Sequence, residues 1–183
     1  LLMHWEKLNE DDFVLLQRSA RQFETIAKAM LISGPLHEKR IALQAIMRLE
    51  LTESLAAVLD IVIDSHHALQ PHANECLQHI CQQWGSRARQ GRDVPSVRHP
   101  MLETLHRYLQ NFPKHRSLQV VDAWLALVHW DDSLQRGLIS DPGNTAFRAV
   151  LQRLDESNET SVLQLLAGYA LRSTTPRTVL LSV

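Results

Sequence analysis

Residues 36–63 read LHEKRIALQAIMRLELTESLAAVLDIVI, and this stretch decides the fold class. Its apolar residues recur at steps of three and four, which places them on one face of a helix. The pattern breaks once, between Glu50 and Thr52, where the chain turns. The spacing therefore predicts two helices, over about 36–49 and 53–67, paired as an antiparallel hairpin. Their inward-facing apolar residues are Ile41, Leu43, Ile46, Leu49, Leu55, Val58, Leu59, Val62 and Ile63.

The same spacing continues on both sides of this hairpin. Upstream, Asn9 is a candidate N-cap for a helix over about 10–32, which Gly34 and Pro35 end. Downstream, helices are expected over about 71–84, from Pro100, from Pro113, from Asp132 to near Gly137, over 145–155 and over 159–172. The whole chain thus contains about nine predicted helices and no predicted strand, so the expected fold class is all-α.

One helical domain is expected over 1–172, followed by a loose tail over 173–183. Residues 85–99 interrupt the helical pattern, because Gly85, Gly91 and Pro95 lie there among several arginines. Glycine and proline in such a cluster are typical of loops. The sequence therefore predicts that Gly85 caps the preceding helix and that 85–99 is a basic loop insertion.

The composition is that of an ordinary globular chain, with 45% apolar residues, 21% charged residues and a formal net charge of −1. It excludes the collagen-like, disordered and small disulfide-rich classes, and its charge balance names no partner. No apolar run approaches the roughly 18 residues of a membrane span, so no membrane partner is expected. Cys76 and Cys81 are five residues apart on one predicted helix, too far apart to pair. Unpaired cysteines favour a cytoplasmic location.

A short apolar motif recurs along the chain. A pair of small or branched apolar residues is followed three positions later by a large apolar residue, and the copies are 34, 44 and 30 residues apart. Two-helix repeats of about 30–45 residues are typical of α-solenoids, in which stacked hairpins bury a shared core. The copies are Ala42-Leu43 with Ile46, Cys76-Leu77 with Ile80, Val120-Val121 with Trp124, and Val150-Leu151 with Leu154.

The stretch from Pro35 to Ile80 resembles the HEAT/armadillo-like helical repeat superfamily. Lys39 to Leu43 are similar to the first helix of such a repeat, and the second helix and the next repeat follow. The resemblance implies an α-α superhelix of about four stacked antiparallel hairpins. The residues that carry its later part are Leu55, Leu59, Ile63, Asp64, Pro71, Cys76 and Leu77.

The resemblance also implies a function. HEAT-like repeats are usually non-catalytic scaffolds for protein–protein interaction, and some bind nucleic acid or act as DNA glycosylases. The alternative to a solenoid is an irregular helical bundle in which the leucines recur by chance.

Positive charge is concentrated in residues 85–116, which contain seven basic residues and only two acidic ones, Asp93 and Glu103. Such a segment could hold the phosphates of a nucleic acid or an acidic protein partner, because arginine makes bidentate contacts with phosphate and carboxylate. The alternative is a solvated loop that balances the acidic flanks. The seven candidates are Arg87, Arg89, Arg92, Arg98, Arg107, Lys114 and Arg116.

No catalytic, cofactor-binding or metal-binding residue is predicted. The chain has no glycine-rich phosphate loop, nucleophile elbow or zinc-protease motif. His72, Cys76 and His79 share one helix face and could suit zinc, but Cys76 occupies a core position of the repeat. Trp130, at a predicted helix end, is a candidate interface anchor, with packing under the next loop as the alternative. The expected function is therefore binding of another protein, with nucleic acid as the second possibility.

Overall fold

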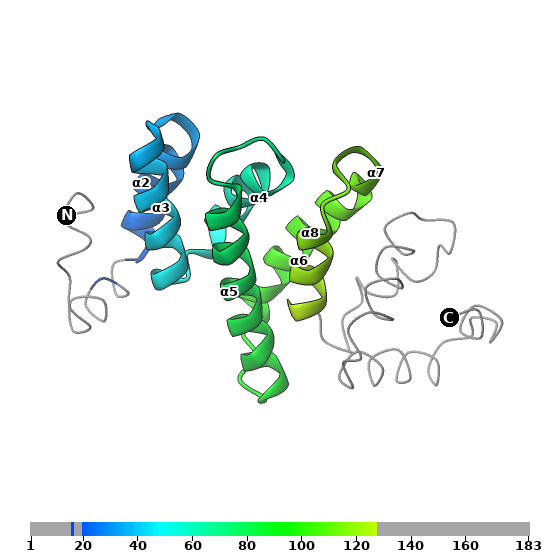
Figure 1. Cartoon of the computed structure of the whole chain (residues 1–183). Helices are drawn as coiled ribbons and strands as arrows, with labels where there is room; N and C mark the ends of the chain where they lie inside the picture. The colour runs from blue at the N-terminus through cyan, green and yellow to red at the C-terminus, as the bar shows by residue number, and fades with distance from the viewer. Residues whose placement is uncertain (1–15, 17–19, 128–183) are drawn as a thin grey trace. The chain divides into compact units, whose positions relative to one another are not determined.

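The computed structural model describes Leu16 and residues 20–127. These residues form helices and no strand, which confirms the all-α class for this part of the chain (Figure 1). The chain divides into two compact units, Leu1–Gln83 and Trp84–Val183. Four predictions lie outside the described residues: the start of the first helix, the helices after residue 127, the tail and Trp130.

The first unit contains α2 (Ala20–Ser33), α3 (Leu36–Leu49), the 3-10 helix η2 (Thr52–Ser54) and α4 (Leu55–Ile63). The prediction of a helix over 36–49 is confirmed. The next helix was predicted to reach residue 67 but ends at Ile63, because Asp64 begins a turn in which its Oδ1 accepts the N–H of His66 at 3.0 Å. Then α5 (Gln70–Arg89) begins in the first unit and continues into the second.

Local residues set the ends of α2 and α3. The N–H of Gly34 donates to the carbonyl of Met30 at 2.9 Å, and Pro35 then precedes α3 as its N-cap. At the far end of α3, Glu50 takes the left-handed conformation with φ 52° and its N–H donates to the carbonyl of Ile46. This geometry closes the last turn of a helix and redirects the chain. The turn predicted at Glu50 is therefore confirmed.

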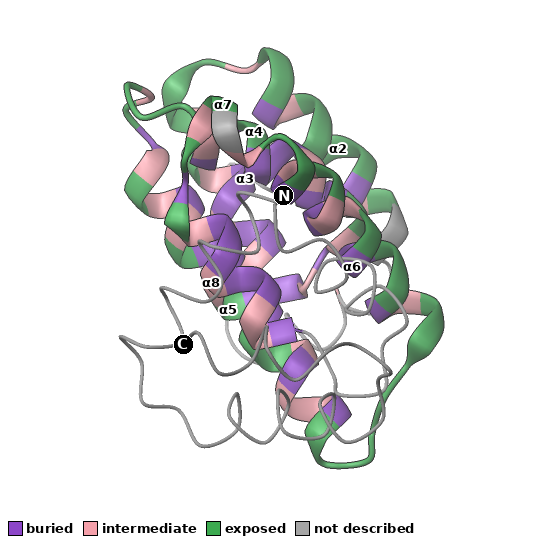
Figure 2. Cartoon of the chain, turned by 90° about the vertical axis from the view of Figure 1, so that its right-hand side faces the viewer, coloured by how far each residue is buried: buried purple, intermediate pink, exposed green. Residues whose placement is uncertain are grey.

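Apolar side chains of the first unit fill a core in which α2 packs against α3 and α4. Glu24 of α2 is buried in the same region, and its Oε1 accepts the backbone N–H of Ser54 at 2.8 Å. Burial raises the pKa of this carboxyl, since desolvation disfavours its charged form. The bond joins α2 to Ser54, the last residue of η2 and the N-cap of α4. The core residues include Ala27, Leu31, Leu43, Ile46, Leu51, Leu55, Val58, Leu59, Val62, Leu77 and Ile80. Figure 2 shows the buried positions along the helices in purple.

The second unit contains the end of α5, α6 (Pro95–Gln110), α7 (Phe112–His115) and α8 (Leu118–Leu127). Its core lies between α6 and α8, which pack against each other. Trp124, predicted as a core residue, is 1% exposed. The other buried apolar residues of these two helices are Met101, Leu102, Leu105, Leu109, Val120, Val121, Ala123 and Leu127.

The predicted loop over 85–99 is wrong. Helix α5 continues through Gly85 to Arg89, and α6 begins at Pro95, so only residues 90–94 lie between helices. Consequently Pro100 lies inside α6 instead of opening it. Proline at Pro95 suits the first turn of a helix, where the missing N–H has no partner to lose.

Gly85 is a helix contact and not a helix cap. A Cβ atom placed on it would overlap the carbonyl oxygen of Ala126 in α8 and lie 2.9 Å from the carbonyl carbon. Only glycine lets the two backbones approach this closely. The glycine that ends the helical segment is Gly91, which has φ +72° and open space around it.

The helix predicted from Pro113 is divided into α7 and α8. Arg116 between them takes the left-handed conformation, with φ 50°. His115 stabilises this corner, because its Nδ1 accepts the N–H of Ser117 at 3.0 Å. Its Nε2 therefore carries the hydrogen and donates to the carbonyl of Tyr108, also at 3.0 Å. Of the helices described, none has both the length and the apolar character needed to cross a membrane.

Substitutions at Gly85 and Gly91 distinguish a glycine that permits a helix contact from a glycine that permits a left-handed backbone. We expect Gly85→Ala to destabilise the protein by about 3 kcal/mol, because the added methyl forces α5 and α8 apart. Gly91→Ala should cost only about 1 kcal/mol, from the left-handed backbone alone. Gly91→Asn should cost less than Gly91→Ala, because asparagine tolerates that conformation. Urea denaturation measures all three, and a Gly85→Ala variant as stable as the wild type would show that the close approach is absent.

Candidate interaction surfaces

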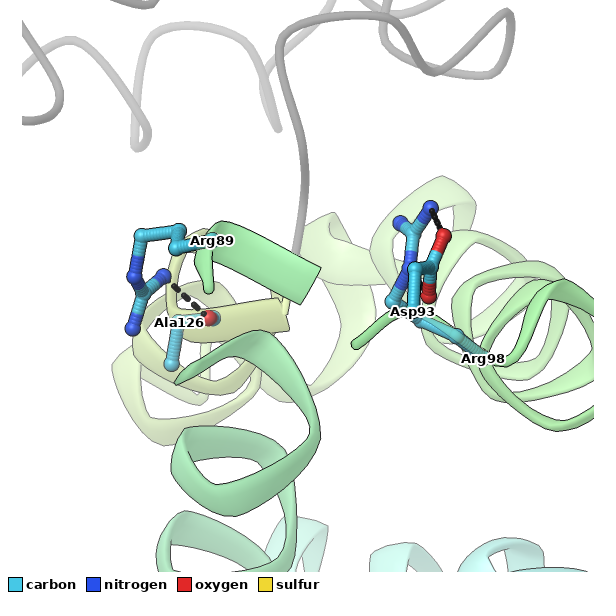
Figure 3. A network of polar contacts seen from close by, with 4 residues as sticks. All are labelled: Arg89, Asp93, Arg98 and Ala126. Carbon is cyan, nitrogen blue, oxygen red and sulfur yellow. Dashed lines mark hydrogen bonds and ion pairs between the residues drawn. The ribbon is translucent and has the colours of Figure 1, made fainter. Parts of the chain in front are cut away.

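The seven basic candidates do not share one environment. Arg98, in the first turns of α6, is only 3% exposed. Its Nε donates to Oδ1 of Asp93 and its Nη2 to Oδ2, both at 2.8 Å (Figure 3). The Arg98 guanidinium lowers the pKa of Asp93, since the bidentate pair favours the carboxylate. Arg98 therefore fixes the loop 90–94 onto α6 and is not available to a partner.

Arg87 and Arg89 lie in the last turns of α5, not in a loop. The Nη1 of Arg89 donates to the carbonyl of Ala126 in α8 at 3.0 Å (Figure 3). The guanidinium carbon of Arg87 lies 4.6 Å from the ring centre of Trp84, within cation–π range. Both arginines thus take part in contacts within the second unit.

Four exposed cations remain, and α6 separates them. Arg92 lies before the first residue of α6, whereas Arg107, Lys114 and Arg116 lie at its last turn and around α7. The helix from Pro95 to Arg107 is about 18 Å long at 1.5 Å per residue. This separation exceeds the Debye length of about 8 Å at physiological salt. Arg92 and the three cations at the other end of α6 therefore do not form one continuous positive surface. The structure therefore divides the predicted basic segment into a structural part and two small exposed groups.

A different surface combines exposed apolar residues with few charges. Ile26 is 50% exposed, Ile32 66% and Leu36 54%. The first two lie on α2, and Leu36 is the first residue of α3, just past the turn at Gly34. Exposed aliphatic side chains close together in one fold element mark interaction sites more often than isolated ones do. We define the α2–α3 face by six exposed residues: Ile26, Lys28, Ala29, Ile32, Leu36 and Arg40.

Sequence reasoning missed this face. The three-and-four spacing of apolar residues places Ala27 and Leu31 on one face of this helix, and both are buried. Ile26 and Ile32 do not belong to that face. An available signal was that the outward positions of this helix contain two isoleucines where a solvated helix normally has charged residues.

The candidate zinc ligands do not converge. Cys76 is buried in the core, as predicted, and burial raises its thiol pKa to about 12. Cys81 is also buried and its pKa is raised by the same effect. His79 on the same helix is exposed. Among the residues that the structure describes, no three His, Cys, Asp or Glu side chains are placed to hold a metal.

Removing the Asp93 charge tests the structural role of Arg98. We expect Asp93→Asn to destabilise the protein by about 1–2 kcal/mol at neutral pH, since it takes the carboxylate from a buried guanidinium while Asp93 itself is exposed. The pKa of Asp93 is lowered by folding, so the pair stabilises above the carboxyl's ordinary range near pH 4 and is lost as pH falls through the lowered value.

The measurement is urea denaturation between about pH 2 and 7. The stabilities of wild type and Asp93→Asn should converge at the acid end. The matched control is Glu103→Gln, which neutralises an exposed acid of α6, the helix that contains Arg98. It should change the free energy of unfolding little. Equal stability of wild type and Asp93→Asn at pH 7 would refute the structural role.

Comparisons with known proteins identify no family. A scan against family models found no match, and searches of curated proteins and of solved structures returned no significant similarity. The function therefore has to be argued from the surfaces of this chain alone.

Proposed function

We propose that this chain is a non-catalytic helical-repeat scaffold that binds another protein through the α2–α3 face. The observation that carries the proposal is the exposure of Ile26, Ile32 and Leu36 on neighbouring helices. Burying such side chains against a partner is favourable by about 25 cal/mol for each Å² of apolar surface removed from water.

The proposed HEAT-like repeat is supported by the burial of its motif. Three copies fall in the described residues, and every residue of these copies is at most 2% exposed. A motif that recurs every 30–44 residues and is buried at each described copy fits repeated hairpins with a shared core.

Nucleic-acid binding is the second candidate, and Arg107, Lys114 and Arg116 favour it. A phosphate-binding groove needs a continuous run of cations along the backbone of the nucleic acid. Here Arg98 is buried, Arg87 and Arg89 make internal contacts, and α6 separates Arg92 from the other three. Protein binding is therefore the better supported function.

Affinity capture with the full chain distinguishes the two functions. We expect a partner protein to be retained after nuclease treatment, and Ile26→Ser with Ile32→Ser to reduce its recovery about tenfold, as for residues at the centre of an interface. The matched control changes two exposed aliphatic residues in the described part of the second unit, Val94→Ser with Leu118→Ser, and should leave recovery unchanged. Quantitative mass spectrometry measures recovery.

Two outcomes would contradict the proposal. One is recovery that does not depend on Ile26 and Ile32. The other is recovery that disappears with nuclease and with Arg107→Glu and Lys114→Glu, which would establish nucleic acid as the ligand.

A further inference from the structure

We infer that the α2–α3 face binds an amphipathic helix of another protein whose apolar stripe is flanked by acidic residues. This inference rests on the proposed function and adds the shape and charge of the partner. It follows from the arrangement of exposed side chains on α2, from the charges beside them, and from the helical character of the surface.

The exposed side of α2 is broad and almost uncharged. Its exposed positions span about 160° of the helix at 100° per residue. Lys28 is the single charged residue among the α2 positions that are described as exposed. The opposite side, with Glu24, Ala27 and Leu31, is buried in the unit's own core. The exposed positions are Gln22, Thr25, Ile26, Lys28, Ala29, Ile32 and Ser33.

The aliphatic residues on this side form a ridge suited to a helix. Ile26, Ala29 and Ile32 follow one another at steps of three, which is one of the two rows that interlock when helices pack. The small Ala29 between two isoleucines leaves room for a large side chain of the partner. Leu36 extends the apolar surface past the turn at Gly34. No strand edge occurs in the described residues, so addition of a partner strand is not available there.

The charges beside the ridge are mainly positive. Lys28 lies one turn before Ile32, and Arg40 lies one turn after Leu36, so each cation is on the same side of its helix as an exposed aliphatic residue. Of the nearby acids, Glu24 is buried against Ser54 and Glu38 is half-buried beside Gly34. A partner with acidic residues along the edges of its apolar stripe would be attracted and oriented by this pattern.

An anionic membrane is a less suitable ligand for the same face. Helices that bind membrane surfaces carry aromatic residues on the apolar side and many cations on the polar side. Among the α2 positions whose exposure is described, the exposed ones include no aromatic residue and one cation, Lys28. The observations therefore favour a protein helix, which recognises a few anchor residues at i, i+3, i+4 and i+7.

Two synthetic peptides test the inference on the full chain. Both are helices of about 15 residues with leucine at i, i+3, i+4 and i+7. One has glutamate at its remaining charged positions, and the other has lysine there. Fluorescence anisotropy at about 50 mM salt should show at least tenfold tighter binding of the glutamate peptide, because surface charge steers such contacts and is little screened at low salt.

Variants connect the binding to this face. Lys28→Glu with Arg40→Glu should reverse the preference between the peptides, and Ile32→Ser should weaken both about tenfold. Val94→Ser with Leu118→Ser should bind as the wild type does, and circular dichroism confirms that each variant remains helical.

The inference is overturned if neither peptide binds, if both bind equally, or if the charge reversal leaves the preference unchanged. Self-association that depends on Ile32 would instead identify a second copy as the occupant, and binding to anionic vesicles but not to peptides would identify lipid. If the peptides fail while affinity capture still depends on Ile26 and Ile32, the proposed function stands and the acidic-helix partner does not.

Discussion

The close approach of α5 and α8 at Gly85 is the constraint on which the second unit depends. With no side chain at this position, the backbone of α5 lies directly against the carbonyl of Ala126. Arg89, one turn later, donates to the same carbonyl group. The carbonyl oxygen of Ala126 thus receives both a tight backbone contact and a charge-assisted hydrogen bond, which fixes the last turns of α5 against α8.

This constraint also decides which cations are exposed. Because α5 remains helical past Gly85, Arg87 and Arg89 belong to a rigid helix whose contacts are internal. The connection to α6 is then short, and the Arg98–Asp93 pair holds it in place. Three of the seven basic residues of the segment therefore make contacts within the fold. For this reason the proposed function rests on the apolar α2–α3 face of the first unit and not on net charge.

The sequence predicted the structure correctly where burial of one helix face by nearby residues determines it. The boundaries of α3, the turn at Glu50 and the buried repeat motif followed from apolar spacing, because burial of one helix face dominates there. Gly85 was misassigned because a glycine at a helix end and one at a helix contact look alike in sequence, and the difference depends on Ala126, far along the chain. Arg98 was misassigned because burial is a property of the folded state. The exposure of Ile26 and Ile32 likewise depends on which side of α2 finds a neighbour.

Amide hydrogen exchange along α5 tests the central claim most directly. If Gly85 is a helix contact, the amides of Ser86 to Arg89 exchange within about tenfold of those of Ile80 to Trp84, since all belong to one packed helix. The amide of Asp93, in the connection between α5 and α6, should exchange much faster. Exchange of Ser86 to Arg89 at the rate of an open loop would show that the helix ends at Trp84, and it would contradict the packing of α5 against α8 through Gly85.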